Sequence, residues 1–123
     1  DGNSFYCLSN SGTKLIKNLD PIDWAQRCQD NGCGEIMLCS INQEGTMLGY
    51  DLDLLKKIRE KITIPIIITG GAGKYKDFLD AFNLDVACVS AGSMYQFTKS
   101  TPSEAKKYLH INSVLIRDSY KYE

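Results

Sequence analysis

Small residues follow three β-rich runs of this sequence, and their types suit the binding of an anionic group. The segments are NQEGT at 42–46, GGAG at 70–73 and AGS at 91–93. Without bulky side chains, backbone N–H groups can approach an anion closely, and a following helix N-terminus adds partial positive charge. Taken singly, each loop is explained at least as well by a tight turn in which glycine supplies a positive φ. Three in succession favour a phosphate site, where we expect an oxyanion to fill the space that the missing side chains leave.

Metal and redox chemistry find little support in the residue types. The single histidine, His110, lies next to a predicted helix and is interpreted as a surface residue. The cysteines, at 7, 28, 33, 39 and 88, show no C-x-x-C spacing. Most of them lie in apolar or amphipathic runs, so we expect buried, reduced thiols in a cytoplasmic protein. Neither a metal nor another cofactor is expected.

The composition is that of one soluble globular domain. The chain has 123 residues, of which 43% are hydrophobic and 24% charged, and its net charge is −1. Scattered basic residues predict no binding to nucleic acid or to an anionic membrane. No apolar run approaches the roughly 20 residues that span a bilayer. The first ten residues lack the basic and apolar regions of a secretory signal.

Around these loops, β-rich runs alternate with amphipathic helices. Strands are predicted at 4–9, 34–41, 64–69 and 85–92. Asp20, followed by Pro21, is typical of a helix N-terminus, and Asp51 is a plausible N-cap for a second helix. A third helix is predicted after the GGAG loop. The TPSE segment at 101–104 predicts a capping box that opens the last helix.

This alternation indicates parallel strands joined by right-handed crossovers. Strands that are apolar throughout, such as IPIIIT at 64–69, are expected to be covered on both faces. An open doubly wound sheet and part of a (β/α)8 barrel both fit. A complete barrel needs eight strands and about 250 residues, and this chain has half of each. If the barrel interpretation holds, the other half comes from a preceding segment, a second chain or a dimer mate.

Four motifs occur in order at suitable spacing: GCGE at 32–35, EGTMLGYD at 44–51, GGAG at 70–73 and AGSMYQF at 91–97. Together they make residues 1–117 resemble the C-terminal half of the cyclase subunits of imidazole glycerol phosphate synthase. The resemblance implies an α/β fold of four (β/α) units, with residues 1–123 supplying strands five to eight of a TIM barrel. It also implies a cytoplasmic lyase of histidine biosynthesis. Such a cyclase receives ammonia from a glutaminase partner and acts on a ribulosyl formimino aminoimidazole carboxamide ribotide that carries two phosphates.

The resemblance also implies roles for particular residues. Glu35 matches a glutamate in the charged ring where ammonia enters the barrel, although a solvated residue at a strand start is the alternative. Asp51 matches a family aspartate, but an N-cap explains it fully. One substrate phosphate is expected on backbone N–H groups and hydroxyls of Gly45, Thr69, Gly71, Gly92 and Ser93.

The departures from the family pattern leave other functions open. The general acid and base of the family are two aspartates, one in each half-barrel, and neither matches a residue of this sequence. Asn42 and Glu44 stand where the family usually has aspartates, and an amide cannot take up a proton. One alternative is a cyclase-like relative that adds nitrogen to surface-polysaccharide sugars. A phosphate-binding half-barrel without catalysis and a flavodoxin-like open sheet with one glycine loop are the others.

Overall fold

The computed structural model describes residues 4–117, in which short strands alternate with helices. The first elements are β1 (Leu8–Ser9), β2 (Lys14–Leu15), α1 (Pro21–Asp30), β3 (Ile36–Cys39) and α2 (Leu52–Arg59). The later ones are β4 (Ile66–Thr69), α3 (Tyr75–Phe82), β5 (Cys88–Val89), α4 (Ser93–Phe97) and α5 (Pro102–Ile111). The strands predicted at 34–41, 64–69 and 85–92 therefore form over shorter cores.

The strands β3, β4 and β5 form a parallel sheet in the order β3-β4-β5. Ile36 pairs with Ile66, and Ile67 pairs with Cys88. Strands adjacent in sequence are also adjacent in the sheet, without the order reversal that a doubly wound fold requires. The fold is mixed α/β, and its parallel part is consistent with part of a (β/α) barrel.

Local capping residues set where three helices begin. The Asp20 carboxylate accepts hydrogen bonds from the N–H groups of Ile22 and Asp23 ahead of Pro21. Asp51 accepts from Leu54 N at 3.1 Å, which confirms its prediction as an N-cap. Thr101 Oγ1 accepts from Glu104 N at 3.2 Å, as the capping box predicts. The return bond of that box is replaced, because Thr101 N donates to Tyr75 Oη.

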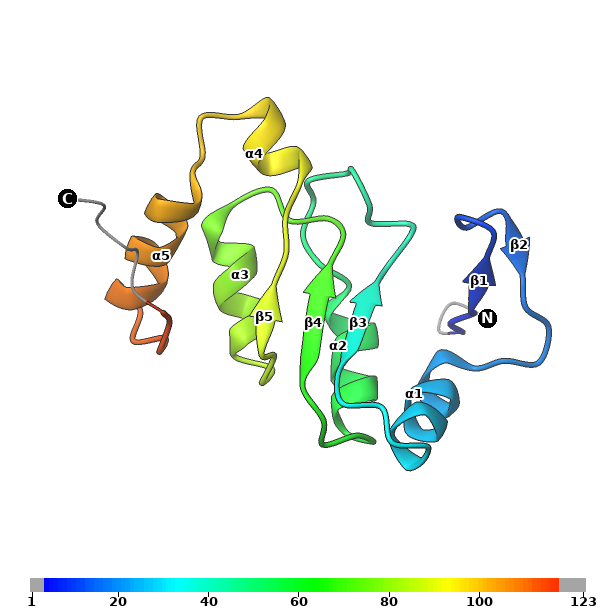
Figure 1. Ribbon diagram of the computed structural model, residues 1–123. Coiled ribbons are helices and arrows are strands. Elements are labelled where there is room, and N and C mark those ends of the chain that lie inside the picture. The colour runs from blue at the N-terminus through cyan, green and yellow to red at the C-terminus, as the bar shows by residue number, and fades with distance from the viewer. Residues whose placement is uncertain (1–3, 118–123) are drawn as a thin grey trace.

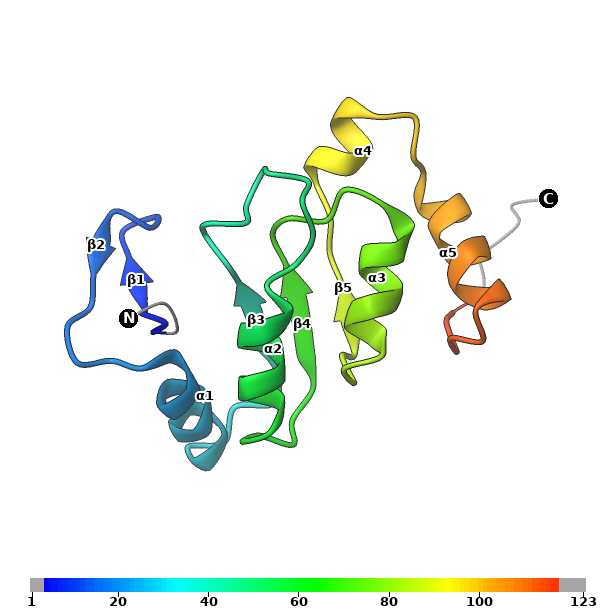
Figure 2. The same cartoon turned by 180° about the vertical axis from the view of Figure 1, so that it is seen from behind.

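One face of the parallel sheet carries the helices and the other is bare. Figures 1 and 2 show α2 and α3 on the same side of β3, β4 and β5. Leu38, Ile66 and Ile68 are buried beneath the helices, whereas Met37, on the opposite face, is 62% exposed. The expectation that both faces are covered is therefore wrong for residues 4–117. The apolar residues of the bare face have no covering layer among the described residues.

The first predicted strand does not join this sheet. Residues 8–9 pair with 14–15 as an antiparallel hairpin, with Leu8 opposite Leu15. The described residues therefore contain three parallel strands, and the expectation of four from 4–9 onward is wrong. The hairpin lies beyond α1, away from β3 (Figure 1). A wide groove, lined by residues of the hairpin, α1, β3 and α2, separates it from the sheet.

The prediction of buried thiols is also wrong. All five cysteines are free, but Cys39 and Cys88 are exposed and Cys7, Cys28 and Cys33 are only partly buried. The physical reason at Cys39 and Cys88 is strand alternation, because both side chains point to the bare face of the sheet.

Candidate functional site

The three small-residue loops meet at one hollow beyond the carboxyl ends of β3, β4 and β5. This end of the sheet, with α4 above it, is uppermost in Figure 1. We call it the three-loop hollow. It brings together all five residues predicted to hold phosphate with five that were not predicted. Its lining consists of Glu44, Gly45, Met47, Thr69, Gly70, Gly71, Ala72, Ala91, Gly92 and Ser93.

Backbone N–H groups are the main donors that this lining offers. Those of Gly45, Gly71, Gly92 and Ser93 donate to no acceptor within residues 4–117. The hydroxyls of Thr69 and Ser93 add two further donors to the lining. Unpaired backbone amides around one hollow are a feature of anion-binding concavities. The arrangement can therefore bind an oxyanion without an arginine or lysine in its lining.

The reason that we expected for the glycines of the GGAG loop is wrong. A Cβ at Gly71 would lie 2.1 Å from the Gly49 carbonyl oxygen, and one at Gly73 would lie 2.1 Å from that of Met47. The protein's own backbone therefore fills the space, which we had assigned to an oxyanion. Gly71 also has φ +108° and accepts a hydrogen bond from Gly49 N at 2.8 Å. These glycines allow the loop after β3 to pack against the loop after β4.

The glycines on the other two sides of the hollow face open space. A Cβ at Gly45 or at Gly92 would meet no atom within 4 Å. Gly45 has φ +76°, so its turn also favours glycine, whereas Gly92 has φ −116°, which any residue adopts. Turn geometry therefore accounts for Gly45 in part but not for Gly92.

One carboxylate lines the hollow among these donors. Glu44 Oε2 lies 3.0 Å from the position that a Cβ at Gly70 would take, and Cys39 Sγ donates to Glu44 Oε2 at 3.8 Å. Partial burial, and then the neighbouring Glu44, raise the pKa of the Cys39 thiol. Cys39 therefore remains a neutral donor near neutral pH, and Glu44 is the negative charge that a bound anion would meet.

Two buried residues that sequence reasoning missed shape the loops. The Asp77 carboxylate accepts from Gly73 N at 2.8 Å and from Lys74 N at 3.0 Å. Tyr50 Oη donates to the Ser90 carbonyl at 2.7 Å. Tyr50 belongs to the GYD motif, and Asp77 stands four residues after the last glycine of the GGAG loop. Each could have been suspected from its motif, but their partners lie in loops whose contacts the sequence does not state.

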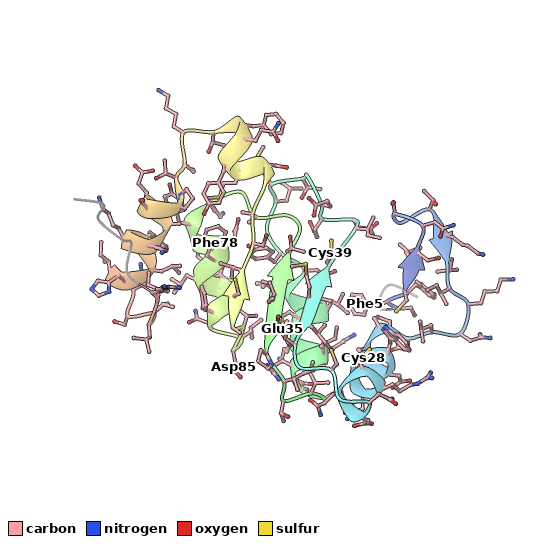
Figure 3. The ribbon with its side chains drawn as sticks, viewed as in Figure 1. Phe5, Cys28, Glu35, Cys39, Phe78 and Asp85 are labelled. Carbon is pink, nitrogen blue, oxygen red and sulfur yellow. The ribbon has the colours of Figure 1, made fainter. Side chains whose placement is uncertain are left out.

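Glu35 lies apart from the hollow. It is exposed and directly precedes β3, so it is at the amino end of the strands, whereas the hollow is at their carboxyl ends. Figure 3 shows Glu35 and Cys39 near opposite ends of β3. Asp51 is also outside the lining, where it accepts from Ser40 Oγ at 3.1 Å besides capping α2.

Neither a metal centre nor a membrane span emerges from the part of the chain that the structure describes. Within residues 4–117, no three side chains of His, Cys, Asp or Glu are grouped so that they could hold a metal ion. Over the same range, every helix is too short or too polar to cross a bilayer. The lining of the hollow itself offers amides, hydroxyls and one carboxylate.

Comparison with known proteins adds a family to this geometry. The family described as "Histidine biosynthesis protein" matches residues 3–101. Imidazole glycerol phosphate synthase subunit HisF of Petrotoga mobilis is 34% identical over 117 residues, which are 95% of this chain and 46% of that protein. The subunit HisF of a Hydrogenobaculum species is 40% identical over 108 residues, 87% of this chain and 43% of that protein. The chain thus spans less than half the length of these relatives.

A solved structure is similar in fold alone. The crystal structure of the Amycolatopsis orientalis BexX/CysO complex contains a chain that is 17% identical to this one, with a TM-score of 0.56. The match covers 81% of this chain and 44% of that one. As in the curated relatives, the similarity extends over part of a longer molecule.

Proposed function

This chain belongs to the histidine biosynthesis protein family, and from that membership we propose that it is one half of a cyclase of the imidazole glycerol phosphate synthase type and supplies one phosphate site. The proposed substrate is a bis-phosphorylated ribulosyl formimino aminoimidazole carboxamide ribotide. In this proposal, the half-barrel holds one of the two phosphates, and ammonia from a glutaminase subunit completes the reaction to imidazole glycerol phosphate.

The observation that carries the proposal is the meeting of Gly45, Thr69, Gly71, Gly92 and Ser93 at one hollow. These residues come from loops after three successive parallel strands, which is where barrel enzymes bind phosphate. A phosphate there would accept hydrogen bonds from the backbone amides and from the hydroxyls of Thr69 and Ser93. The amides supply dipoles that need no reorganisation when the anion arrives.

We further propose that residues 1–123 are one domain that forms part of a (β/α)8 barrel. Two features support this. The edge of β3 is unpaired within residues 4–117, and the sheet face that carries Met37 is uncovered. An added strand would satisfy the N–H and C=O groups at the edge of β3, and the remaining strands would enclose the bare face. The groove between the hairpin and β3 leaves room for such a strand.

The acid and base of the cyclisation are proposed to come from the remainder of the barrel. Asn42 cannot take up a proton, and Glu44 lines the proposed anion site. In this proposal, residues of the hollow orient the substrate through its phosphate, and binding energy from this remote group holds the reacting carbon in place.

Glu35 is proposed to act where ammonia enters, since it lies at the amino end of the strands, opposite the hollow. Replacing Glu35 by Gln should then lower glutamine-dependent turnover at least several-fold more than turnover with free ammonium. Glu60→Gln, at the exposed end of α2, is the control. Equal losses with both nitrogen sources would reject this role.

A direct test of the phosphate site is a titration of the ¹⁵N-labelled full-length protein with inorganic phosphate. The amides of Gly45, Gly71, Gly92 and Ser93 should shift and saturate together, while those of Gly32 and Gly34, at the other end of the strands, should not move. Absence of saturable shifts would reject the site. Turnover of the ribotide with ammonium would then test the cyclase itself, and phosphate binding without turnover would favour the polysaccharide-type relative or the non-catalytic half-barrel.

A further inference from the structure

Tyr50 connects two of the loops that line the three-loop hollow. It ends the loop after β3 and is only 6% exposed. Its hydroxyl donates to the Ser90 carbonyl at 2.7 Å, and its ring stacks on Phe78 with centroids 6.3 Å apart. Ser90 follows β5 directly and stands two residues before Gly92. The bond therefore joins the loop that contains Gly45 to the segment that contains Gly92 and Ser93.

Gly49, which precedes Tyr50, contacts the third loop, the one after β4. Gly49 N donates to the Gly71 carbonyl at 2.8 Å, so two consecutive residues hold the loops after β4 and β5. Ser90 N in turn donates to the Ile68 carbonyl at 2.9 Å, which secures that segment on β4. Gly45, Gly71 and Gly92 thus lie on three loops that residues 49 and 50 connect.

The hydroxyl of Tyr50 acts on the hollow only through these bonds. Tyr50 is not among the residues that line the hollow. Burial is the largest cause that raises the pKa of Tyr50 far above its ordinary value, followed by the neighbouring Tyr95 and Asp77. The hydroxyl is therefore a permanent donor to Ser90 across the physiological pH range.

We propose that Tyr50 is a positioning residue that sets the separation between the Gly45 amide and the amides of Gly92 and Ser93. The inference rests on the proposed phosphate site, and it names the residue that determines the distance between the amides on two sides of that site. Donors that bind one anion must keep their spacing within about 0.5 Å, and a single buried hydrogen bond between loops is suited to hold it.

The test compares Tyr50→Phe with Tyr75→Phe in the full-length protein. Tyr50→Phe removes the hydroxyl and keeps the ring that stacks on Phe78. Tyr75 is the matched control, because its hydroxyl donates to Glu104 at 2.8 Å and accepts from Thr101 N at 2.9 Å. Those bonds join α3 to the start of α5, and Tyr75 does not line the hollow.

Two measurements are made on each variant: the Kd for inorganic phosphate, and hydrogen exchange at the amides of Gly49 and Ser90. Tyr50→Phe should weaken phosphate binding about fivefold and speed exchange at both amides about tenfold, because two loops lose their common anchor. Tyr75→Phe should leave the Kd and both exchange rates within about twofold of the parent protein.

Unchanged exchange in Tyr50→Phe would overturn the inference, as would raised exchange with an unchanged Kd or equal effects of Tyr75→Phe. If the parent protein binds no phosphate, the proposed site fails. Exchange then still decides whether Tyr50 holds the two loops: faster exchange at Gly49 and Ser90 in Tyr50→Phe alone supports that part of the inference.

Discussion

The loop after β4 and the segment after β5 line the same hollow, yet their glycines are there for different reasons. At Gly71 and Gly73, the side-chain space is occupied by the carbonyl oxygens of Gly49 and Met47, each 2.1 Å from the position of a Cβ. At Gly92 that space is empty. The first loop is packed against protein, and the second faces the opening.

Glycines in such a motif can serve the stability of the fold or the binding of a ligand, and this difference tells the two apart. Substitutions in the loop after β4 should act on stability, because they separate two packed backbones. Substitutions at Gly92 should act on ligand binding with little effect on the fold. A change at Gly71 would mostly report on folding.

The largest effect is expected for Gly73→Ala. Its backbone is outside the left-handed region, so the added methyl acts only by its contact with the Met47 carbonyl. We expect it to lower the free energy of unfolding by about 3 kcal/mol, as severe overpacking does. Chemical denaturation measures the change. Gly34→Ala, where a Cβ meets no atom within 4 Å, is the control. Equal stability of the two variants would remove the distinction between packed and open glycines.

Asp77→Asn should give the next largest effect. Asp77 is 7% exposed and accepts two N–H groups from the loop after β4. Loss of the charge on these bonds should lower the free energy of unfolding by about 1.5 kcal/mol. Asp80→Asn, on the same helix, removes an ion pair with Lys76, whose side chain is 59% exposed, and should cost under about 0.5 kcal/mol. A cost at Asp77 no larger than at Asp80 would contradict the role of Asp77.

Gly92→Ala tests the open side of the hollow. The methyl group would enter empty space, so stability should stay within about 0.5 kcal/mol of the parent protein. Affinity for inorganic phosphate should fall about tenfold, equivalent to about 1.4 kcal/mol, because the methyl would take the place of an anion oxygen. Calorimetric titration measures the affinity, again with Gly34→Ala as the control. Unaltered affinity would mean that the anion does not reach this segment.

The smallest effect is expected for Glu44→Gln, which removes the negative charge from the lining of the hollow. It tests the open side of the hollow by charge, without adding any atoms there. Phosphate affinity should rise two- to threefold at low salt, and the gain should shrink with ionic strength because the carboxylate is exposed. Glu60→Gln, an exposed carboxylate outside the hollow, is the control. A loss of affinity in Glu44→Gln would show instead that the carboxylate assists binding.

Much of the fold followed from local patterns. The three parallel strands, the helices α2, α3 and α5 and the caps at Asp20, Asp51 and Thr101 were predicted, with strand ends that differ by several residues. The short helix α4 was not predicted. Residues 4–9 were predicted to form a parallel strand but form part of a hairpin. A short β-rich run predicts an extended segment. The strand with which that segment pairs depends on the tertiary structure around it.

The predicted binding residues do lie together, but the contacts that hold them in place were not predicted. Gly45, Thr69, Gly71, Gly92 and Ser93 do meet at one hollow, because loops after successive parallel strands end at the same edge. Glu44 and Met47 in the lining were not foreseen. The Tyr50–Ser90 bond spans 40 residues of sequence, and no periodicity signals a contact of that kind.

The sequence by itself determined the order of the elements, where the main helices begin, and which loops carry small residues. These properties depend on neighbouring residues, through caps, side-chain period and backbone freedom. Only the tertiary structure decided which glycines are packed and which are open, which face of the sheet is bare, and which residues hold the three loops together. Those properties arise from atoms that are distant in sequence and meet only when the chain has folded, so no local pattern contains them.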